Sequence, residues 1–286
     1  MKYKIIDKKD FPNKLKQIKN PPDKLYAIGN IDLLKQDAFA IVGTRKISEY
    51  GIKNCKSFTK EFVLRNIPVV SGMALGTDSI AHKAALEYEG KTIAVLGSGF
   101  NHIFPEENTN LFHNIVNSNG LVITEFEENT KPLKENFPRR NRIITAISEG
   151  VLVIEAAYRS GTSITARNAK EQGKKVFAIP GRLDNYLGVG VNKLIKEGAI
   201  LTTSIDDIIQ SFPQFMNKKR IIIKENKSYM NKKCKKIYNS IFQKEKTLDE
   251  LLIENNLDFT SLIEIISKLE LEKYIYQDMD GKYKIT

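Results

Sequence analysis

The sequence predicts an α/β protein with a mostly parallel sheet, followed by a small C-terminal domain. Between residues 38 and 201, seven short apolar runs alternate with stretches of helical pattern. Continuous apolar runs are typical of strands covered on both faces, and the intervening helices supply the cover. Beyond Ile209 the pattern changes to a basic stretch and then to a compact helical segment. The 286 residues therefore suffice for one domain of ordinary α/β size and a smaller one.

Residues 1–37 are a mixed segment with three prolines, which we expect to form a lobe packed on the domain of residues 38–212. Within that domain, helices are expected over residues 48–65 and 76–86, each after a glycine-bearing turn. The predicted strands are residues 39–42, 68–70, 92–96, 121–124, 151–154, 175–179 and 199–201.

Glycine, serine or arginine follows several of these predicted strands. Right-handed crossovers bring the carboxyl ends of parallel strands to one edge of the sheet, so the turns should converge there. Glycines allow close approach of the chain, and free backbone N–H groups at such turns bind anions. The candidate residues are Gly43, Thr44, Arg45, Ser71, Gly72, Gly76, Gly97, Ser98 and Gly99.

The segment Glu135–Thr145 carries three arginines within four positions, directly after an aromatic residue and a proline. Guanidinium groups bind oxygen anions in forked pairs, and phosphate is a common partner. Phe137 or Tyr158 offers a face for a base, so an extended single strand could meet these features in succession. A rigid duplex could not enter a cleft between turns. The candidates in this segment are Phe137, Arg139, Arg140, Asn141 and Arg142.

The composition describes a globular protein that favours a polyanionic partner. The net charge is +11 and the pI is about 9.4, although heavy use of lysine accounts for part of this excess. No apolar run reaches the roughly 20 residues that a membrane span needs. The start of the chain lacks a signal-peptide core, so we expect a cytoplasmic protein. Cys55 and Cys234 lack metal-ligand spacing and should be free thiols.

The candidates for acid–base chemistry are few. Glu125 and Glu155 each follow a predicted strand, and His82 follows Asp78 by four residues on a predicted helix. We expect a structural, hydrogen-bonded histidine there, and an interaction of Asp78 with free amides at the helix start. His102 and His113 form no triad order, and no Walker A loop is present. We therefore expect a protein that is not an enzyme and uses neither metal nor cofactor.

The C-terminal part has the outline of a winged helix. Residues 213–233 are expected to form a basic linker that either stays solvated or contacts a polyanion. In residues 234–286, helical patterns precede a predicted hairpin, and Thr247 to Glu250 is a capping box. Winged-helix domains often place the second helix of their helix–turn–helix motif in a DNA groove. The helix predicted over residues 258–271 is acidic, so contact with a protein or a structural role is an alternative.

Seven motifs, in order, resemble the DNA-processing protein A (DprA/Smf) family. They span roughly residues 10 to 210, and the small C-terminal domain agrees with one that many members carry. The motifs occupy residues 42–45, 71–82, 92–99, 137–144, 155–166, 176–181 and 190–195.

The resemblance implies an extended Rossmann-like fold that binds single-stranded DNA without catalysing a reaction. It also implies a homodimer that protects incoming DNA and loads the RecA recombinase during natural transformation or recombination. Arg45, Arg139 and the glycine turns would hold the DNA backbone, while the dimer and RecA contacts would lie near residues 190–210. The turn of residues 155–166 adds Ser160, Gly161 and Thr162 to the expected DNA-binding residues.

This chain departs from the family pattern in two places. Leu75 stands where a basic residue is usual, and no N-terminal helical domain is expected because the Rossmann-like lobe begins almost at residue 1. Two alternatives remain. One is a nucleotide hydrolase similar to the phosphoribohydrolases, although residues 159–164 lack the double glycine and the glutamate of their loop. The other is a duplex-binding regulator led by the winged helix.

Overall fold

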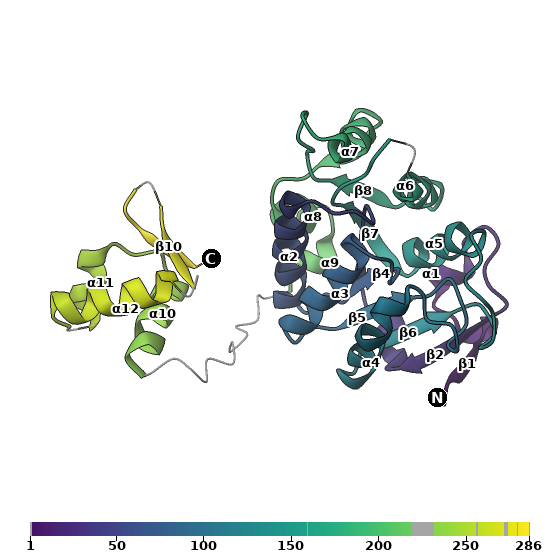
Figure 1. The fold of residues 1–286 in the computed structure, drawn as a ribbon, viewed down its shortest axis with the longest axis horizontal. Coiled ribbons are helices and arrows are strands. Elements are labelled where there is room, and N and C mark those ends of the chain that lie inside the picture. Colours follow the sequence, from purple (N-terminus) through teal and green to yellow (C-terminus); the bar gives the residue numbers. More distant parts are fainter. Residues whose placement is uncertain are drawn as a thin grey trace. The chain divides into compact units, whose positions relative to one another are not determined.

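The computed structural model describes residues 2–158, 160–218, 232–255, 257–271, 274–278 and 280–285, and the side chain of Lys232 is not described. These residues belong to two compact units, Met1–Ile223 and Lys224–Thr286 (Figure 1). Most of the predicted basic linker, residues 219–231, lies outside the described residues. The boundaries predicted at residues 212 and 233 remain predictions.

The first unit is built on one nine-stranded sheet with the order β1-β2-β6-β5-β4-β3-β7-β8-β9. From β6 to β9 all neighbouring strands are parallel, whereas β2 pairs antiparallel with both β1 and β6. The strands are β1 (Lys4–Asp7), β2 (Lys24–Gly29), β3 (Ala38–Val42), β4 (Val69–Ser71), β5 (Thr92–Val95), β6 (Leu121–Thr124), β7 (Ser148–Val153), β8 (Lys175–Ala178) and β9 (Ile200–Leu201).

Helices cover both faces of this sheet (Figure 1). Successive side chains of a strand point to opposite faces, and in β3 both faces are apolar. Ala40 packs in the hydrophobic cluster that includes residues of α5, α6 and α7, and its neighbour Phe39 packs in the cluster that includes residues of α2, α3 and α8. The helices are α1 (Asn13–Lys16), α2 (Glu49–Leu64), α3 (Thr77–Glu87), α4 (Thr109–Asn117), α5 (Asn136–Ala146), α6 (Gly161–Glu171), α7 (Tyr186–Lys196), α8 (Ile205–Ile209) and α9 (Pro213–Met216). Short 3-10 turns are η1 (Lys8–Asp10), η2 (Ile31–Lys35) and η3 (Glu106–Asn108).

The strand order reverses between β3 and β7. Along the chain, β3 to β6 proceed toward one edge of the sheet, and β7 to β9 proceed toward the other. Loops that leave the carboxyl ends of adjacent strands at such a switch point diverge to opposite faces and leave a crevice between them. The crevice between the loops after β3 and β7 is where the fold itself favours a ligand.

The predicted α/β fold with a mostly parallel sheet is confirmed. All seven predicted strands are present, and the helices expected over residues 48–65 and 76–86 are α2 and α3. The prediction of a lobe over residues 1–37 did not include β1 and β2, which extend the sheet beyond β6. Pro213–Met216 form α9, in which Phe215 is fully buried.

The second unit contains three helices and a hairpin around its own apolar core. Ile237, Leu251 and Leu262, one from each helix, are fully buried in this core. Thr247 and Glu250 exchange the two hydrogen bonds of a capping box. This is the element order expected of a winged helix, and its identity as one remains a prediction. The elements are α10 (Lys232–Gln243), α11 (Leu248–Asn255), α12 (Phe259–Leu271), β10 (Ile275–Gln277) and β11 (Tyr283–Ile285).

Candidate functional site

A cavity of about 650 Å³ opens at the switch point of the sheet. The loop after β3, the start of α5 and the start of α6 form its walls, so segments far apart in sequence meet there. It gathers nine residues predicted for the site: Gly43, Thr44, Arg45, Phe137, Arg140, Asn141, Ser160, Gly161 and Thr162.

The loop after β3 is held by backbone contacts on two sides. The Thr44 N–H donates to the Glu155 carbonyl at 2.8 Å, and the Thr44 carbonyl accepts from the Thr77 N–H and hydroxyl, each at 3.1 Å. Gly76 has φ +76°, and a Cβ there would lie 2.4 Å from the Thr44 carbonyl oxygen. Only glycine allows this approach, which leaves the following Arg45 on a well-defined turn.

Arg45 is exposed, and its guanidinium lies 5.5 Å from the centre of the Phe137 ring. Phe137 in turn packs against the backbone of Gly97, where a Cβ would come within 2.8 Å of the ring. A cation–π contact of this kind orients the arginine without neutralising its charge. Arg45 is therefore oriented and still available to an anion.

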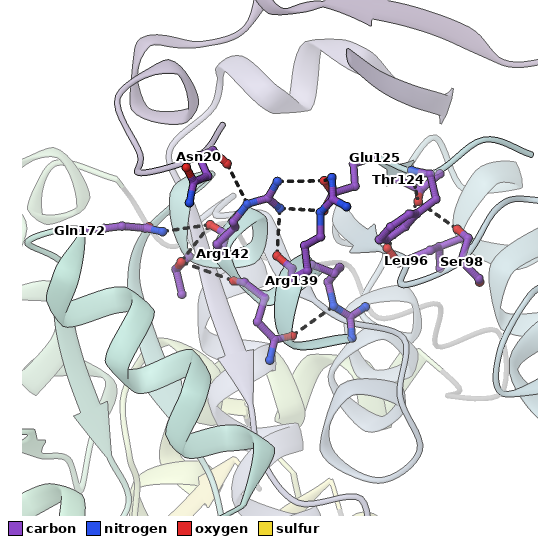
Figure 2. A network of polar contacts seen from close by, with 12 residues as sticks. Asn20, Leu96, Ser98, Thr124, Glu125, Arg139, Arg142 and Gln172 are labelled. Atoms are coloured by element: carbon purple, nitrogen blue, oxygen red, sulfur yellow. Dashed lines mark hydrogen bonds and ion pairs between the residues drawn. The ribbon is translucent and has the colours of Figure 1, made fainter. Parts of the chain in front are cut away.

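Arg139 and Arg142 share one carboxylate (Figure 2). Glu125, whose side chain is 2% exposed, accepts two hydrogen bonds from Arg142 at 2.7 and 2.8 Å and pairs with Arg139 at 2.9 Å. Arg142 also donates to the Asn20 carbonyl and is only 14% exposed, whereas Arg139 is 61% exposed. Arg142 thus ties α5 to the N-terminal segment, and Arg139 remains accessible to an external anion.

Arg140 lies inside the protein. Its guanidinium donates to the carbonyls of Gly72 and Val95, at the ends of β4 and β5, and only 4% of the residue is exposed. Burial lowers the pKa of Arg140 to about 10, and the nearby carboxylate of Asp78 opposes that shift. Burial raises the pKa of Asp78, and Arg140 opposes that shift in turn. The two charged groups are therefore buried near each other, and each opposes the pKa shift that burial imposes on the other.

Asp78 also performs the role expected at the start of α3. Its carboxylate accepts from the N–H groups of Gly72 and Ala74 at 3.2 and 3.3 Å. The loop between β4 and α3 is therefore closed on itself, and the N–H groups of Gly72 and Ala74 are already used by the protein.

The placement of these residues revises part of the expected site. Six predicted DNA contacts are buried and support the site from below, because their polar groups or their lack of a side chain serve contacts within the protein. Gly99, for example, packs on the backbone of Glu127, and the Ser98 hydroxyl donates to the His102 carbonyl at 2.6 Å. The six are Ser71, Gly72, Gly97, Ser98, Gly99 and Arg140.

Two residues that sequence reasoning missed line the cavity. Lys134 is exposed on the loop before α5, and Phe104 is 42% exposed on the loop after β5. Neither belongs to a glycine-bearing turn or to the arginine cluster. Their position relative to the sheet edge depends on loops of irregular structure, which the pattern of apolar runs does not predict.

The start of α6 faces the same cavity. Gly161 is exposed, and Thr162 is the second residue of this 11-residue helix. The first N–H groups of a helix lack partners within the helix and favour a negative charge. Arg159, which precedes Ser160, lies outside the described residues.

The two acid–base candidates at strand ends are occupied by structural contacts. Glu155 is 2% exposed and accepts from the N–H and the hydroxyl of Ser48, the N-cap residue of α2. Glu125 is engaged by two arginines. This geometry gives no support to the nucleotide-hydrolase alternative.

His82 and the cysteines are also buried. The His82 Nδ1 lies 2.7 Å from the Thr92 hydroxyl, and burial together with the charge of Arg140 lowers its pKa to about 3. Cys55 and Cys234 are both buried, and burial raises the pKa of Cys55 to about 12. Within the described residues, no three histidine, cysteine or acidic side chains come together as a metal-binding group. In the same part of the chain, no helix combines the length and apolarity needed to cross a membrane.

Fold and site together define an open α/β protein with a basic, aromatic-lined cavity at the switch point of its sheet. Such a cavity, next to a helix start, suits a phosphate-bearing ligand. The chain belongs to the DNA recombination-mediator protein A family, whose model matches residues 2–213.

Known relatives share the first unit. The chain is 42% identical over 205 residues to protein Smf of Escherichia coli. The aligned residues are 72% of this chain and 55% of that protein. A crystal structure of DNA processing protein A from Streptococcus pneumoniae is similar with a TM-score of 0.70 and 41% identity, over 74% of this chain and 75% of that one. A structure of DNA processing protein A from Helicobacter pylori, on its single-stranded DNA binding mode, is similar with a TM-score of 0.67 and 32% identity. This match covers 73% of this chain and 94% of that one.

Proposed function

We propose that this protein binds single-stranded DNA at the switch-point cavity and does not catalyse a reaction on it. The observation that carries the proposal is the division among its arginines. Arg45 and Arg139 are accessible beside the cavity, while Arg140 and Arg142 brace the elements that present them. Accessible cations next to aromatic rings are the combination that binds a single strand through its phosphates and bases.

The form of the site favours one strand over a duplex. The cavity lies between turns and is lined by Phe104 and Phe137, of which Phe104 is the more exposed. An exposed ring face there can meet only a base that is not stacked inside a duplex. The relative from Helicobacter pylori, at 32% identity, binds single-stranded DNA. Both observations support the choice of ligand.

We extend the proposal to a cytoplasmic homodimer that protects incoming DNA and loads RecA recombinase during natural transformation or recombination. Membership of a family described as recombination mediators supports this role. An apolar surface at the start of α7 supports self-association: Leu183, Tyr186 and Val189 are 94%, 62% and 47% exposed. The DNA binding proposed here needs no metal or cofactor.

The second unit is not the main DNA contact in this proposal. The helix α12, which would enter a DNA groove in a winged helix, exposes Glu264 and Glu270 beside Lys268. Acidic side chains facing phosphates are unfavourable, so α12 does not favour the duplex-binding alternative.

The proposal is tested by titrating labelled oligo-dT and the matching duplex, followed by fluorescence anisotropy over a salt series. We expect tight binding of the single strand alone. Arg45→Ala and Arg139→Ala should each weaken it about tenfold, because hydrogen bonds to charged groups contribute about 1.5 to 3 kcal/mol. Each substitution should also make the slope of log K against log salt concentration shallower by about 0.7, because one phosphate contact is lost.

Arg182→Ala is the matched control. Arg182 is 64% exposed and pairs with Asp184, much as Arg139 is 61% exposed and pairs with Glu125. Arg139 lies between the cavity-lining residues Pro138 and Arg140, whereas neither neighbour of Arg182 lines that cavity. Unchanged binding in Arg45→Ala and Arg139→Ala, or an equal loss in Arg182→Ala, would refute the site. Preference for the duplex would refute the proposed ligand.

A further inference from the structure

Phe104 is an exposed aromatic residue in a basic cavity. It is 42% exposed and lines the cavity together with Arg45 and Lys134. Its ring centre lies 5.6 Å from that of Phe137, with the planes inclined by 52°. Phe137 is already used, since it packs on Gly97 and under the Arg45 guanidinium. Phe104 is therefore the ring with a surface left for a ligand.

The loop that carries Phe104 is anchored on both sides. Before it, the Ser98 hydroxyl donates to the His102 carbonyl at 2.6 Å, and the Asn101 N–H donates to the Glu128 carbonyl at 2.9 Å. After it, the Asn108 amide donates to the Met73 carbonyl at 2.7 Å. A ring held in advance loses little conformational freedom when a ligand binds, so such a contact contributes more to affinity.

The charges around Phe104 indicate which part of a nucleotide it would meet. Arg45, Lys134 and the start of α6 lie along the cavity and attract a phosphate. Glu106 and Glu107, directly after Phe104-Pro105, are exposed acids and disfavour a phosphate next to the ring. A neutral base is the part of the ligand that can lie there.

We propose that Phe104 contacts an unpaired base of the bound strand, while the phosphates of that strand are held at Arg45 and Lys134. The inference rests on the proposed function and adds a base-dependent contact to a phosphate site. The cavity, whose lining includes Phe104 and the start of α6, has a volume of about 650 Å³, which is room for one nucleotide. This contact lets the protein distinguish a single strand from a polyanion without bases and from a duplex, whose bases are stacked on each other.

The test compares oligo-dT with an abasic oligonucleotide of the same length, bound to the full chain. Phe104→Ala should weaken oligo-dT binding by about tenfold, because base–aromatic stacking contributes about 1 to 3 kcal/mol per base. It should leave the salt slope and the affinity for the abasic strand unchanged. Phe104→Tyr keeps the ring face and should bind as the wild type does.

Leu133→Ala is the matched control, since Leu133 is 50% exposed on a neighbouring loop but does not line the cavity. An equal loss on the abasic strand in Phe104→Ala, or loss of oligo-dT binding in Phe104→Tyr, would assign Phe104 a role in holding the loop and overturn the inference. Undiminished oligo-dT binding in Phe104→Ala would also overturn it but leave the proposed function standing. Failure of the wild type to bind oligo-dT would instead remove the proposed function and this inference together.

Discussion

At the scale of residues, three arginines that are neighbours in sequence lie in three environments. Successive helix positions are 100° apart, so Arg139 and Arg142, three positions apart, share one side of α5 and meet the same Glu125. Arg140 is turned toward the sheet, where it reaches Gly72 and Val95. The helix thus separates a residue that can bind a ligand from one that assembles the site.

Removal of Arg140 should cost the fold far more than removal of Arg139. In Arg140→Met, Asp78 keeps a buried carboxylate without its cation, and such losses cost about 3 to 5 kcal/mol. In Arg139→Met only an exposed cation is lost, and we expect a change within about 1 kcal/mol. Urea unfolding followed by circular dichroism measures the difference. Equal midpoints for the two variants would show that the buried charge of Arg140 does not stabilise the first unit.

At the scale of elements, the sequence indicates strands better than it indicates the site. Continuous apolar runs mark β3 to β8 because nearly all residues of those strands are buried, whereas Leu201 in the short edge strand β9 is 51% exposed. The strand β1 escapes prediction because Ile5 is 54% exposed and the segment is short and flanked by lysines. Turn glycines indicate the edge where the cavity forms, yet Gly97 and Gly99 serve close packing there. Only the tertiary contacts distinguish a glycine that supports the site from one that faces a ligand.

Gly76 joins the loop after β4 to the loop after β3, and its replacement should show this coupling. It has φ +76° and ψ −126°, and a Cβ would lie 2.4 Å and 2.5 Å from the Thr44 and Arg45 carbonyl oxygens. Gly173 also has a positive φ, +68°, but no atom lies within 4 Å of a Cβ built there. An alanine at Gly173 would suffer only backbone strain, whereas an alanine at Gly76 would also collide with the neighbouring loop.

We expect Gly173→Ala to cost about 1 kcal/mol, the usual strain of a left-handed alanine, and to leave DNA binding unchanged. Gly76→Ala should cost at least about 2 kcal/mol and weaken oligo-dT binding, because the loop that carries Arg45 has to move. Thermal unfolding and the anisotropy titration measure the two effects. If Gly76→Ala binds oligo-dT with wild-type affinity, the contact between the loops does not position Arg45.

At the scale of the whole molecule, the two units differ in their similarity to known proteins. The family model ends at residue 213, so the similarity covers the first unit and not the three helices and hairpin that follow. The cavity, its cations and the apolar surface of α7 all belong to the first unit. DNA binding and self-association should therefore both be properties of that unit.

The proposed homodimer makes a prediction about the start of α7. Tyr186 and Val189 are three positions apart, so they lie on one side of the helix, and Leu183 precedes them with 94% exposure. A charge inside an apolar interface has to lose its hydration without a partner, which costs several kcal/mol. Val189→Arg should therefore reduce the mass in solution from twice 32.5 kDa to that of one chain.

Ile5→Arg is the control, because Ile5 is 54% exposed on β1 and the substitution adds the same charge away from α7. Light scattering coupled to size exclusion measures both variants against the wild type. The α7 surface is the interface only if Val189→Arg alone becomes a monomer. A dimeric Val189→Arg places the interface elsewhere. A monomeric wild type removes the dimer from the proposal, and the Leu183–Val189 surface then needs a different partner.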